Sequence, residues 1–339
     1  MARKRDEAHV PEPAEAKEAL ERALFEIRRV IAGQDLMLER VLVCLLTGGH
    51  LLIEGVPGLA KTLTVKTTAS VLGGTFSRIQ FTPDLVPSDL VGTRIYRPDS
   101  GSFDTELGPV FCNFLLADEI NRAPAKVQSA LLEVMQERQV TIGHNTHPVP
   151  DPFLAMATQN PIESEGTYPL PEAQVDRFML KILVDYPLHD EELTVVMRQL
   201  EPPPDLLQAL SLEDLRALQR TVAGIYVDPG LVSYAVTLAT ATRRPADFGL
   251  PELREYVAFG ASPRGPISVI QASRALAVLR GRTYVLVQDV QELAKDAMRH
   301  RLVLTYQALA EERSPDSILD AVLAAVPVPQ LDLGRETAA

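Results

Sequence analysis

The sequence of 339 residues contains no tryptophan and only two cysteines. Cys44 and Cys112 each lie in an apolar run, which is typical of small core residues and not of a disulfide framework. A disulfide-stabilised secreted domain is therefore excluded, and we expect a reducing compartment, the cytoplasm. Hydrophobic residues make up 46% of the chain, which is enough for a full-sized core and about two domains.

Excess positive charge and long apolar runs are also missing. The formal net charge is −12, which disfavours nonspecific attraction to nucleic acid or to anionic membranes. The most apolar stretch, residues 41–53, is interrupted by Gly48-Gly49-His50 and is shorter than the roughly 20 residues that span a bilayer. The basic residues 2–5 are followed at once by Asp6-Glu7, so they do not begin a secretory signal. We expect no membrane insertion.

Apolar runs of strand length alternate with helical patterns through the first part of the chain. The runs that we expect to form one sheet are residues 50–53, 76–81, 113–117, 153–157 and 178–184. Strands that alternate with helices form a parallel sheet covered on both faces. We therefore predict an α/β fold with a five-stranded parallel sheet. Two hairpin insertions, at about 93–105 and 139–149, interrupt the alternation.

From residue 189 onward the strand pattern stops. Ser211, Asp228-Pro229 and Ser262-Pro263 each resemble a helix cap followed by a first turn, so we predict a small helical bundle. The predicted segments are a disordered N-terminus (1–13), the α/β core (14–187), a helical lid domain (188–326) and a loose tail (327–339).

A glycine-bearing loop joins the run that ends at Ile53 to a helical segment, which is the context of a phosphate-binding loop and predicts that the α/β fold is of the P-loop NTPase type. Gly55 and Gly58 would leave the loop bare, so that backbone N–H groups reach triphosphate oxygens. Lys61 can reach the β- and γ-phosphates, and the Thr62 hydroxyl can ligate Mg²⁺. Ala60 replaces the usual last glycine, and a helical Ala60 would need no positive φ. The predicted nucleotide-binding residues are Gly55, Val56, Pro57, Gly58, Leu59, Ala60, Lys61 and Thr62.

Polar side chains follow two further strands of the predicted sheet. Asp118 and Glu119 end one apolar run, and Asn160 follows another. Ligands of parallel sheets bind outside the carboxyl ends of the strands, where the phosphate loop also lies. We assign Asp118 to Mg²⁺, through a water molecule, and Glu119 to the base that activates the attacking water. Asn160 would hold that water or the γ-phosphate.

Two arginines are candidates for transition-state charge. Arg177 precedes the last strand and is either an arginine finger for a neighbouring subunit or a partner of Asp176 or Glu172. Arg264 lies in the first turn of a predicted helix, where the helix dipole opposes a cation. A bound anion would explain that position, so the helical domain is expected to supply Arg264 to the nucleotide.

Several motifs together resemble the MoxR family of AAA+ ATPases over roughly residues 14–325. They are Gly55-Val56-Pro57-Gly58-Leu59-Ala60-Lys61-Thr62, Asp118-Glu119-Ile120-Asn121-Arg122-Ala123-Pro124, Ala157-Thr158-Gln159-Asn160-Pro161, Glu165-Gly166-Thr167-Tyr168-Pro169-Leu170-Pro171-Glu172-Ala173-Gln174 and Ser262-Pro263-Arg264-Gly265. The stretch from Thr167 to Phe178 is the most specific to this family.

The resemblance implies roles for single residues. Lys61 corresponds to the Walker A lysine, Asp118 and Glu119 to the Walker B pair, and Asn160 to sensor 1. Arg177 and Arg264 correspond, in the same way, to the arginine finger and to sensor 2.

The resemblance also implies an Mg²⁺-dependent ATPase in a ring, six subunits being expected, with an unidentified client protein. It would remodel or activate that client, or assist metal insertion into it, with a von Willebrand factor A domain partner. A magnesium-chelatase-like motor remains an alternative. A DNA-acting ATPase is disfavoured by the acidic balance and by the lack of an aromatic-basic stripe.

Overall fold

A computed structural model describes residues 10–56, 58–99, 101–161, 167–168, 170–202 and 204–330. Most of the predicted disordered N-terminus and loose tail lies outside the described residues, as do Pro57 and the motif residues Glu165, Gly166 and Pro169. The chain divides into two compact units, Met1–Arg220 and Thr221–Ala339. This division falls later in the chain than the boundary drawn from the sequence, and the domain limits stay a prediction.

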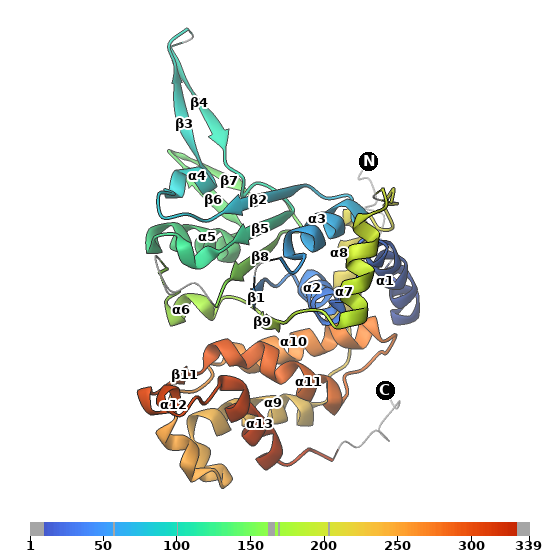
Figure 1. Cartoon of the computed structure of the whole chain (residues 1–339), viewed down its shortest axis with the longest axis vertical. Helices are drawn as coiled ribbons and strands as arrows, with labels where there is room; N and C mark the ends of the chain where they lie inside the picture. The colour runs from blue at the N-terminus through green and yellow to red at the C-terminus, as the bar shows by residue number, and fades with distance from the viewer. Residues whose placement is uncertain are drawn as a thin grey trace, which may run out of the picture. The chain divides into compact units, whose positions relative to one another are not determined.

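The first unit is built on one five-stranded sheet with the strand order β2-β5-β8-β1-β9 (Figure 1). All neighbouring strands are parallel, as predicted. The strands are β1 (Leu51–Gly55), β2 (Phe76–Gln80), β5 (Phe114–Asp118), β8 (Leu154–Gln159) and β9 (Leu180–Val184). Because they are parallel, their carboxyl ends lie at one edge of the sheet, where a ligand is expected.

Helices cover both faces of this sheet because alternate strand residues point to opposite sides. Leu115 and Ala117 of β5 lie in one buried cluster with Val127 and Leu131 of α5 (Ala125–Glu137). On the other face, α2 (Asp35–Thr47) contacts β1 and β9, and α3 (Lys61–Val71) contacts β2 and β5. Helix α1 (Pro13–Arg28) packs on α3. The predicted three-layer core is therefore confirmed.

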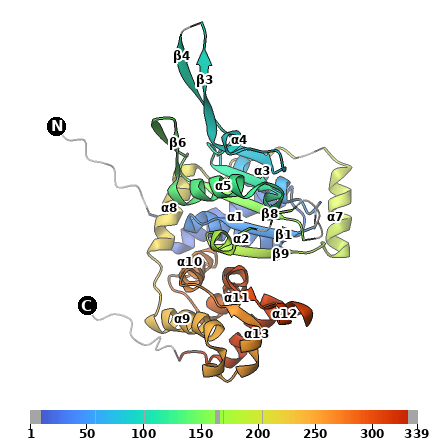
Figure 2. The ribbon, with the colours of Figure 1, turned by 90° about the vertical axis from the view of Figure 1, so that its left-hand side faces the viewer.

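Two antiparallel hairpins extend from the first unit (Figure 2). One pairs β3 (Gly92–Arg97) with β4 (Ser102–Leu107), and the other pairs β6 (Gln139–Ile142) with β7 (Asn145–Pro148). The β3–β4 hairpin carries the exposed aromatic pair Tyr96 and Phe103, whose ring centroids are 5.2 Å apart. Short helical segments connect the hairpins and strands: α4 (Pro87–Val91), η1 (Ile120–Arg122) and α6 (Glu172–Val175).

Helix α7 (His189–Gln199) was not anticipated and has an unusual environment, because none of its residues is buried. Its apolar side chains Leu193, Val196 and Met197 are all more than half exposed. The helix is joined to the unit by polar contacts, for example from Nη1 of Arg198 to the carbonyl oxygen of Arg28, at 2.8 Å. Helix α8 (Leu212–Ala223) follows it.

The second unit is a helical bundle, as predicted for the lid. Its longer helices, α9 (Pro229–Arg243), α10 (Arg264–Leu279), α11 (Val287–Met298) and α13 (Pro315–Ala325), contact one another. Shorter segments are η2 (Pro245–Phe248), η3 (Pro251–Glu255), η4 (Arg299–Arg301) and α12 (Tyr306–Ala310). The expectation that strands stop after residue 189 is wrong, because β10 (Val257–Phe259) pairs with β11 (Val303–Leu304). Strands of two or three residues are too short to show a period in the sequence.

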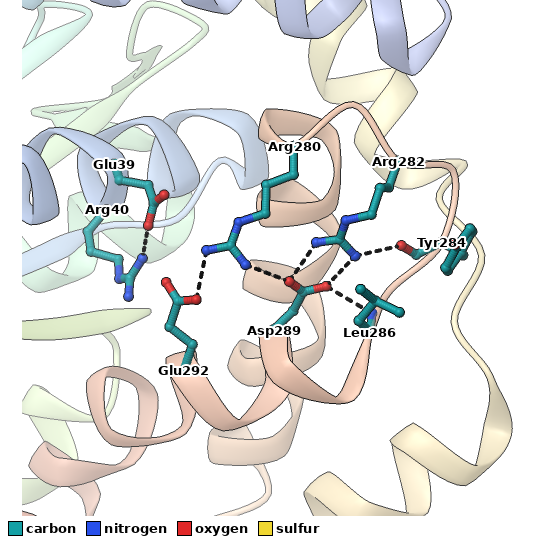
Figure 3. Close-up of polar contacts among 8 residues, drawn as sticks. All are labelled: Glu39, Arg40, Arg280, Arg282, Tyr284, Leu286, Asp289 and Glu292. Atoms are coloured by element: carbon teal, nitrogen blue, oxygen red, sulfur yellow. Dashed lines mark hydrogen bonds and ion pairs between the residues drawn. The ribbon is translucent and has the colours of Figure 1, made fainter. Parts of the chain in front are cut away.

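A buried carboxylate organises one end of this bundle (Figure 3). Asp289 of α11 has 0% of its side chain exposed, and it forms ion pairs with Arg280 at 2.9 Å and Arg282 at 2.6 Å. Its Oδ2 also accepts the backbone N–H of Leu286 at 2.8 Å, at the start of α11. Asp289 therefore holds the end of α10 and the start of α11 together.

In the described part of the chain, we find no helix whose length and apolar character would let it cross a membrane.

Candidate nucleotide site

The loop between β1 and α3 has the form expected of a phosphate-binding loop. Gly58 has a φ of +89°, and a Cβ built on it would meet no atom within 4 Å, so the loop is open at this point. Ala60 caps α3 with a φ of +55°. A helical Ala60 would have needed no positive φ, but that condition is not met. For a residue other than glycine, this left-handed conformation costs roughly 1–2 kcal/mol.

Lys61 is held at the first position of α3, above the end of β1. Only 9% of the residue is exposed, and its Nζ donates a hydrogen bond to the carbonyl oxygen of Gly55 at 2.5 Å. Burial lowers the pKa of Lys61, and the nearby charges of Asp118, Glu119 and Glu54 oppose that shift. No carboxylate of the described residues forms an ion pair with this ammonium group. A bound anion would therefore compensate for its desolvation.

Asp118 is the last residue of β5, and both of its carboxylate oxygens are engaged. Its Oδ1 accepts the hydroxyl of Thr158 at 2.6 Å, and its Oδ2 accepts Nη2 of Arg78 at 2.7 Å and Nε at 3.2 Å. The Thr158 hydroxyl oxygen also accepts the backbone N–H of Glu119 at 2.8 Å. Neighbouring strands thus fix the orientation of Asp118 at the sheet edge.

Glu119 lies just outside the strand, in the left-handed conformation with a φ of +56°. Its Oε2 accepts Nε2 of Gln80 at 2.7 Å and lies 3.3 Å from Nε of Arg122. The left-handed turn at Glu119 follows the last residue of β5, and Asp118 and Glu119 line the same cavity. Two acidic side chains with different partners therefore meet at one point, as a metal-binding residue and a general base require.

One cavity of about 390 Å³ collects most of the predicted site residues. It is lined by Gly55, Gly58, Leu59, Ala60, Lys61, Thr62, Leu63, Arg78, Gln80, Asp118, Glu119, Thr158 and Asn160. Val56 is not among the lining residues, and Pro57 lies outside the described residues. Asn160, which directly follows β8, is buried at the cavity wall. Residues far apart in the sequence therefore meet at the edge where the sequence placed them.

The two predicted arginines are not among the residues that line this cavity. Arg177 follows α6, and its guanidinium group has no hydrogen bond or ion pair with any described residue. Arg264 is the first residue of α10, in the second unit. Its backbone N–H donates to the Ser262 hydroxyl at 3.2 Å. The roles assigned to Arg177 and Arg264 stay predictions.

Three further residues line the cavity but were not predicted as site residues from the sequence: Arg78, Gln80 and Thr158. Arg78 and Gln80 occupy alternate positions of β2, so they lie on the same side of the strand. Polar residues that alternate near the carboxyl end of a predicted strand would have been a usable signal. Thr158 stands two residues before Asn160 in the family motif, and its own role could not be read without its contact to Asp118.

The donors in this cavity fit a nucleotide with Mg²⁺. Thr62 and Asp118 supply the oxygen atoms that Mg²⁺ prefers, and Lys61 supplies a desolvated positive charge for phosphate. Within the part of the chain that the structure describes, no group of three or more His, Cys, Asp or Glu side chains could hold a metal alone. Mg²⁺ commonly binds one or two protein groups and shares the phosphates of its substrate.

Comparisons with known proteins agree with this geometry. Residues 50–180 match the model of the ATPase family associated with various cellular activities, and residues 253–322 match an AAA lid domain. The chain is 60% identical to "Chaperone MoxR1" of Mycobacterium tuberculosis, over 92% of this chain and 83% of that protein. It is 33% identical to "Protein MoxR" of Paracoccus denitrificans, over 88% of this chain and 93% of that protein.

A solved structure shares the fold. The crystal structure of an ATPase candidate from Cytophaga hutchinsonii superposes with a TM-score of 0.89 at 46% sequence identity, and the match covers 94% of this chain and 97% of that one. The α/β core and the helical lid are therefore common to both proteins.

Proposed function

Because the chain belongs to the MoxR family of AAA+ ATPases, we propose that it binds ATP with Mg²⁺ and hydrolyses it to ADP and phosphate. The observation that carries this proposal is the cavity at the sheet edge. There Lys61 is desolvated, its Nζ donates to the Gly55 carbonyl oxygen, and no described carboxylate lies within ion-pair distance, although the charges of Asp118 and Glu119 act on it. A buried ammonium group for the phosphates and two nearby carboxylates for a metal ion and a water molecule suit a nucleotide that binds together with Mg²⁺.

The residues divide the work as follows. Lys61 and the loop backbone hold the phosphates, and Thr62 and Asp118 would hold Mg²⁺, which neutralises charge on the phosphate oxygens when bound. Glu119 takes a proton from the attacking water. The water oxygen then forms a bond to the γ-phosphorus, and the bond between the γ-phosphorus and the oxygen that bridges to the β-phosphate breaks. Asn160 orients that water or the γ-phosphate. The buried position of Asn160 at the cavity wall supports this role.

The site is tested by separating binding from hydrolysis. Lys61→Ala should abolish binding of a fluorescent ATP analogue, whereas Lys66→Ala, an exposed position on the same helix, should leave it unchanged. Glu119→Gln should retain binding but lower hydrolysis by about 100-fold or more, the contribution of a general base. Glu133→Gln on the exposed side of α5 is the matched control. Full turnover in Glu119→Gln would contradict the assignment.

The protein is further proposed to act as a ring, six subunits being expected, in which Arg177 reaches the nucleotide of a neighbour. The support is the family and the absence of any described partner for the Arg177 guanidinium group. Arg177→Ala and Lys61→Ala subunits should each be inactive alone and should regain some hydrolysis when mixed. Verified mixed rings without activity would argue against a shared site. Arg264 is proposed to contact the nucleotide phosphates from the lid.

For the cellular task, we propose chaperone-like work on a client protein in the cytoplasm: remodelling, activation or assistance with metal insertion. A von Willebrand factor A domain protein is the proposed partner. A relative named "Chaperone MoxR1" and the exposed Tyr96–Phe103 pair on the β3–β4 hairpin support an interaction with other proteins. Glu119→Gln, which should hold ATP without hydrolysis, should retain client and partner in a pull-down. Equal capture by Lys61→Ala would argue against nucleotide-controlled binding.

A further inference from the structure

Arg78 is an unexpected cation at the candidate nucleotide site. It lies on β2, at the edge of the sheet, and reaches across to the last residue of β5. We propose that Arg78 is a positioning residue that acts as the resident counter-ion of Asp118, so that Mg²⁺ must compete with it for this carboxylate. Arg78 would thereby set the Mg²⁺ concentration at which the site loads. This inference rests on the proposed nucleotide binding.

The contacts of Asp118 show where Arg78 and a metal ion would compete, namely at its Oδ2 atom. Arg78 donates to Oδ2 through both Nη2, at 2.7 Å, and Nε, at 3.2 Å, while Thr158 donates to Oδ1 at 2.6 Å. A metal ion or a metal-bound water that takes Oδ2 has to displace at least one of these charge-assisted bonds. Thr158 is buried, whereas 46% of the Arg78 side chain is exposed, so Arg78 is the partner that can leave.

Charge favours the same exchange. Two like charges on one carboxylate repel each other, so an arriving divalent cation pushes the guanidinium group away from Asp118. As the ion pair is partly exposed, its contribution is modest, about 1 kcal/mol at most. Arg78 should therefore tune the affinity for Mg²⁺ by up to about fivefold and not block it.

The exchange would also reach Glu119. Nη2 of Arg78 donates to Oε1 of Gln80 at 2.8 Å, and Nε2 of Gln80 donates to Oε2 of Glu119 at 2.7 Å. Because the same nitrogen, Nη2, makes both bonds, movement of Arg78 away from Asp118 would also disturb its bond to Gln80. Occupation of Asp118 is thus linked through two side chains to the orientation of the proposed base.

The test measures Mg²⁺ dependence without hydrolysis. A fluorescent ADP analogue is held at a low fixed concentration and MgCl₂ is titrated, so that the readout is the half-saturating Mg²⁺ concentration. Arg78→Gln should lower this concentration by up to about fivefold. Arg78→Lys, which keeps the charge, should remain close to the parent protein. Arg97→Gln removes an arginine from a more exposed ion pair, with Asp104 on the β3–β4 hairpin, and should change nothing.

The possible outcomes separate this inference from the proposed function. If the parent protein binds the analogue with Mg²⁺ and folded Arg78→Gln needs as much Mg²⁺ or more, Arg78 does not compete and the inference fails alone. If the parent protein binds no nucleotide, the proposed function fails and this inference with it. Thermal unfolding of each variant establishes its folding, and Arg78→Ala repeats the measurement if Arg78→Gln is unstable.

Discussion

His50 should make the first unit sensitive to mild acid. It lies at the start of β1 with 5% exposed, where its Nδ1 accepts the backbone N–H of Ala155 at 3.0 Å. Its Nε2 therefore carries the proton and donates to the carbonyl oxygen of Met135 at 3.1 Å. The neutral ring forms hydrogen bonds with both backbone groups. A protonated ring would carry a second N–H group that faces the N–H group of Ala155 and repels it.

The size of the effect follows from the pKa. Burial, reinforced by the positive charge of Arg138, lowers the pKa of His50 from 6.5 to about 3, and the Met135 carbonyl opposes the shift only in part. As pH falls below the unfolded value, the unfolded chain takes up the proton first and the folded state loses stability. The loss should be about 2 kcal/mol at about pH 5 and should continue to grow toward the folded pKa.

His50→Gln removes the titration while keeping a donor and an acceptor. Both cysteines, Cys44 and Cys112, are buried in the first unit, so their labelling by a dipyridyl disulfide across a urea series reports its unfolding. Between about pH 7.5 and about pH 5, the parent protein should lose about 2 kcal/mol more than His50→Gln. The exposed His144→Gln should behave like the parent protein. Equal losses in parent and His50→Gln would refute the reasoning.

Two further changes should alter stability in opposite directions. Ala60→Gly should raise the free energy of unfolding of the first unit by about 0.5–1 kcal/mol, since glycine adopts the observed φ of +55° without strain. Urea denaturation with thiol labelling measures this free energy. A loss of stability would contradict the statement that Ala60 is strained. Asp289→Ala should lower the stability of the second unit by about 3 kcal/mol, because Arg280 and Arg282 lose a buried partner. Asp320→Ala is the control, because it breaks only an exposed ion pair with Lys295 and should change the stability of the second unit by less than about 1 kcal/mol. Thermal unfolding followed by circular dichroism compares the two variants.

The elements that the sequence predicted best are those with a local signal. The strand, glycine loop and helix around Lys61 follow from neighbouring residues alone, and the strands ending at Asp118 and Gln159 are apolar runs of the expected length. Because carboxyl ends of parallel strands meet, even the convergence of Lys61, Asp118 and Asn160 could be predicted.

What the sequence did not predict depends on partners that are distant along the chain. The ion pair between Arg78 and Asp118 could be predicted only if β2 were known to lie beside β5, and the residues of the two strands do not indicate this strand order. The left-handed Ala60 is set by the path between β1 and α3, while its residue type favours a helix. The strands β10 and β11 exist because they pair with each other, since neither has enough residues for a pattern.

The lack of buried residues in α7 has a consequence for how it opens. A segment that exposes little new surface on opening has a small denaturant dependence, because the m-value scales with newly exposed area. Amide hydrogens of α7 should then exchange by local fluctuations at a rate almost independent of urea, whereas those of β5 and β8 should require cooperative unfolding. The first unit would thus carry a helix whose order is decoupled from the core beneath it.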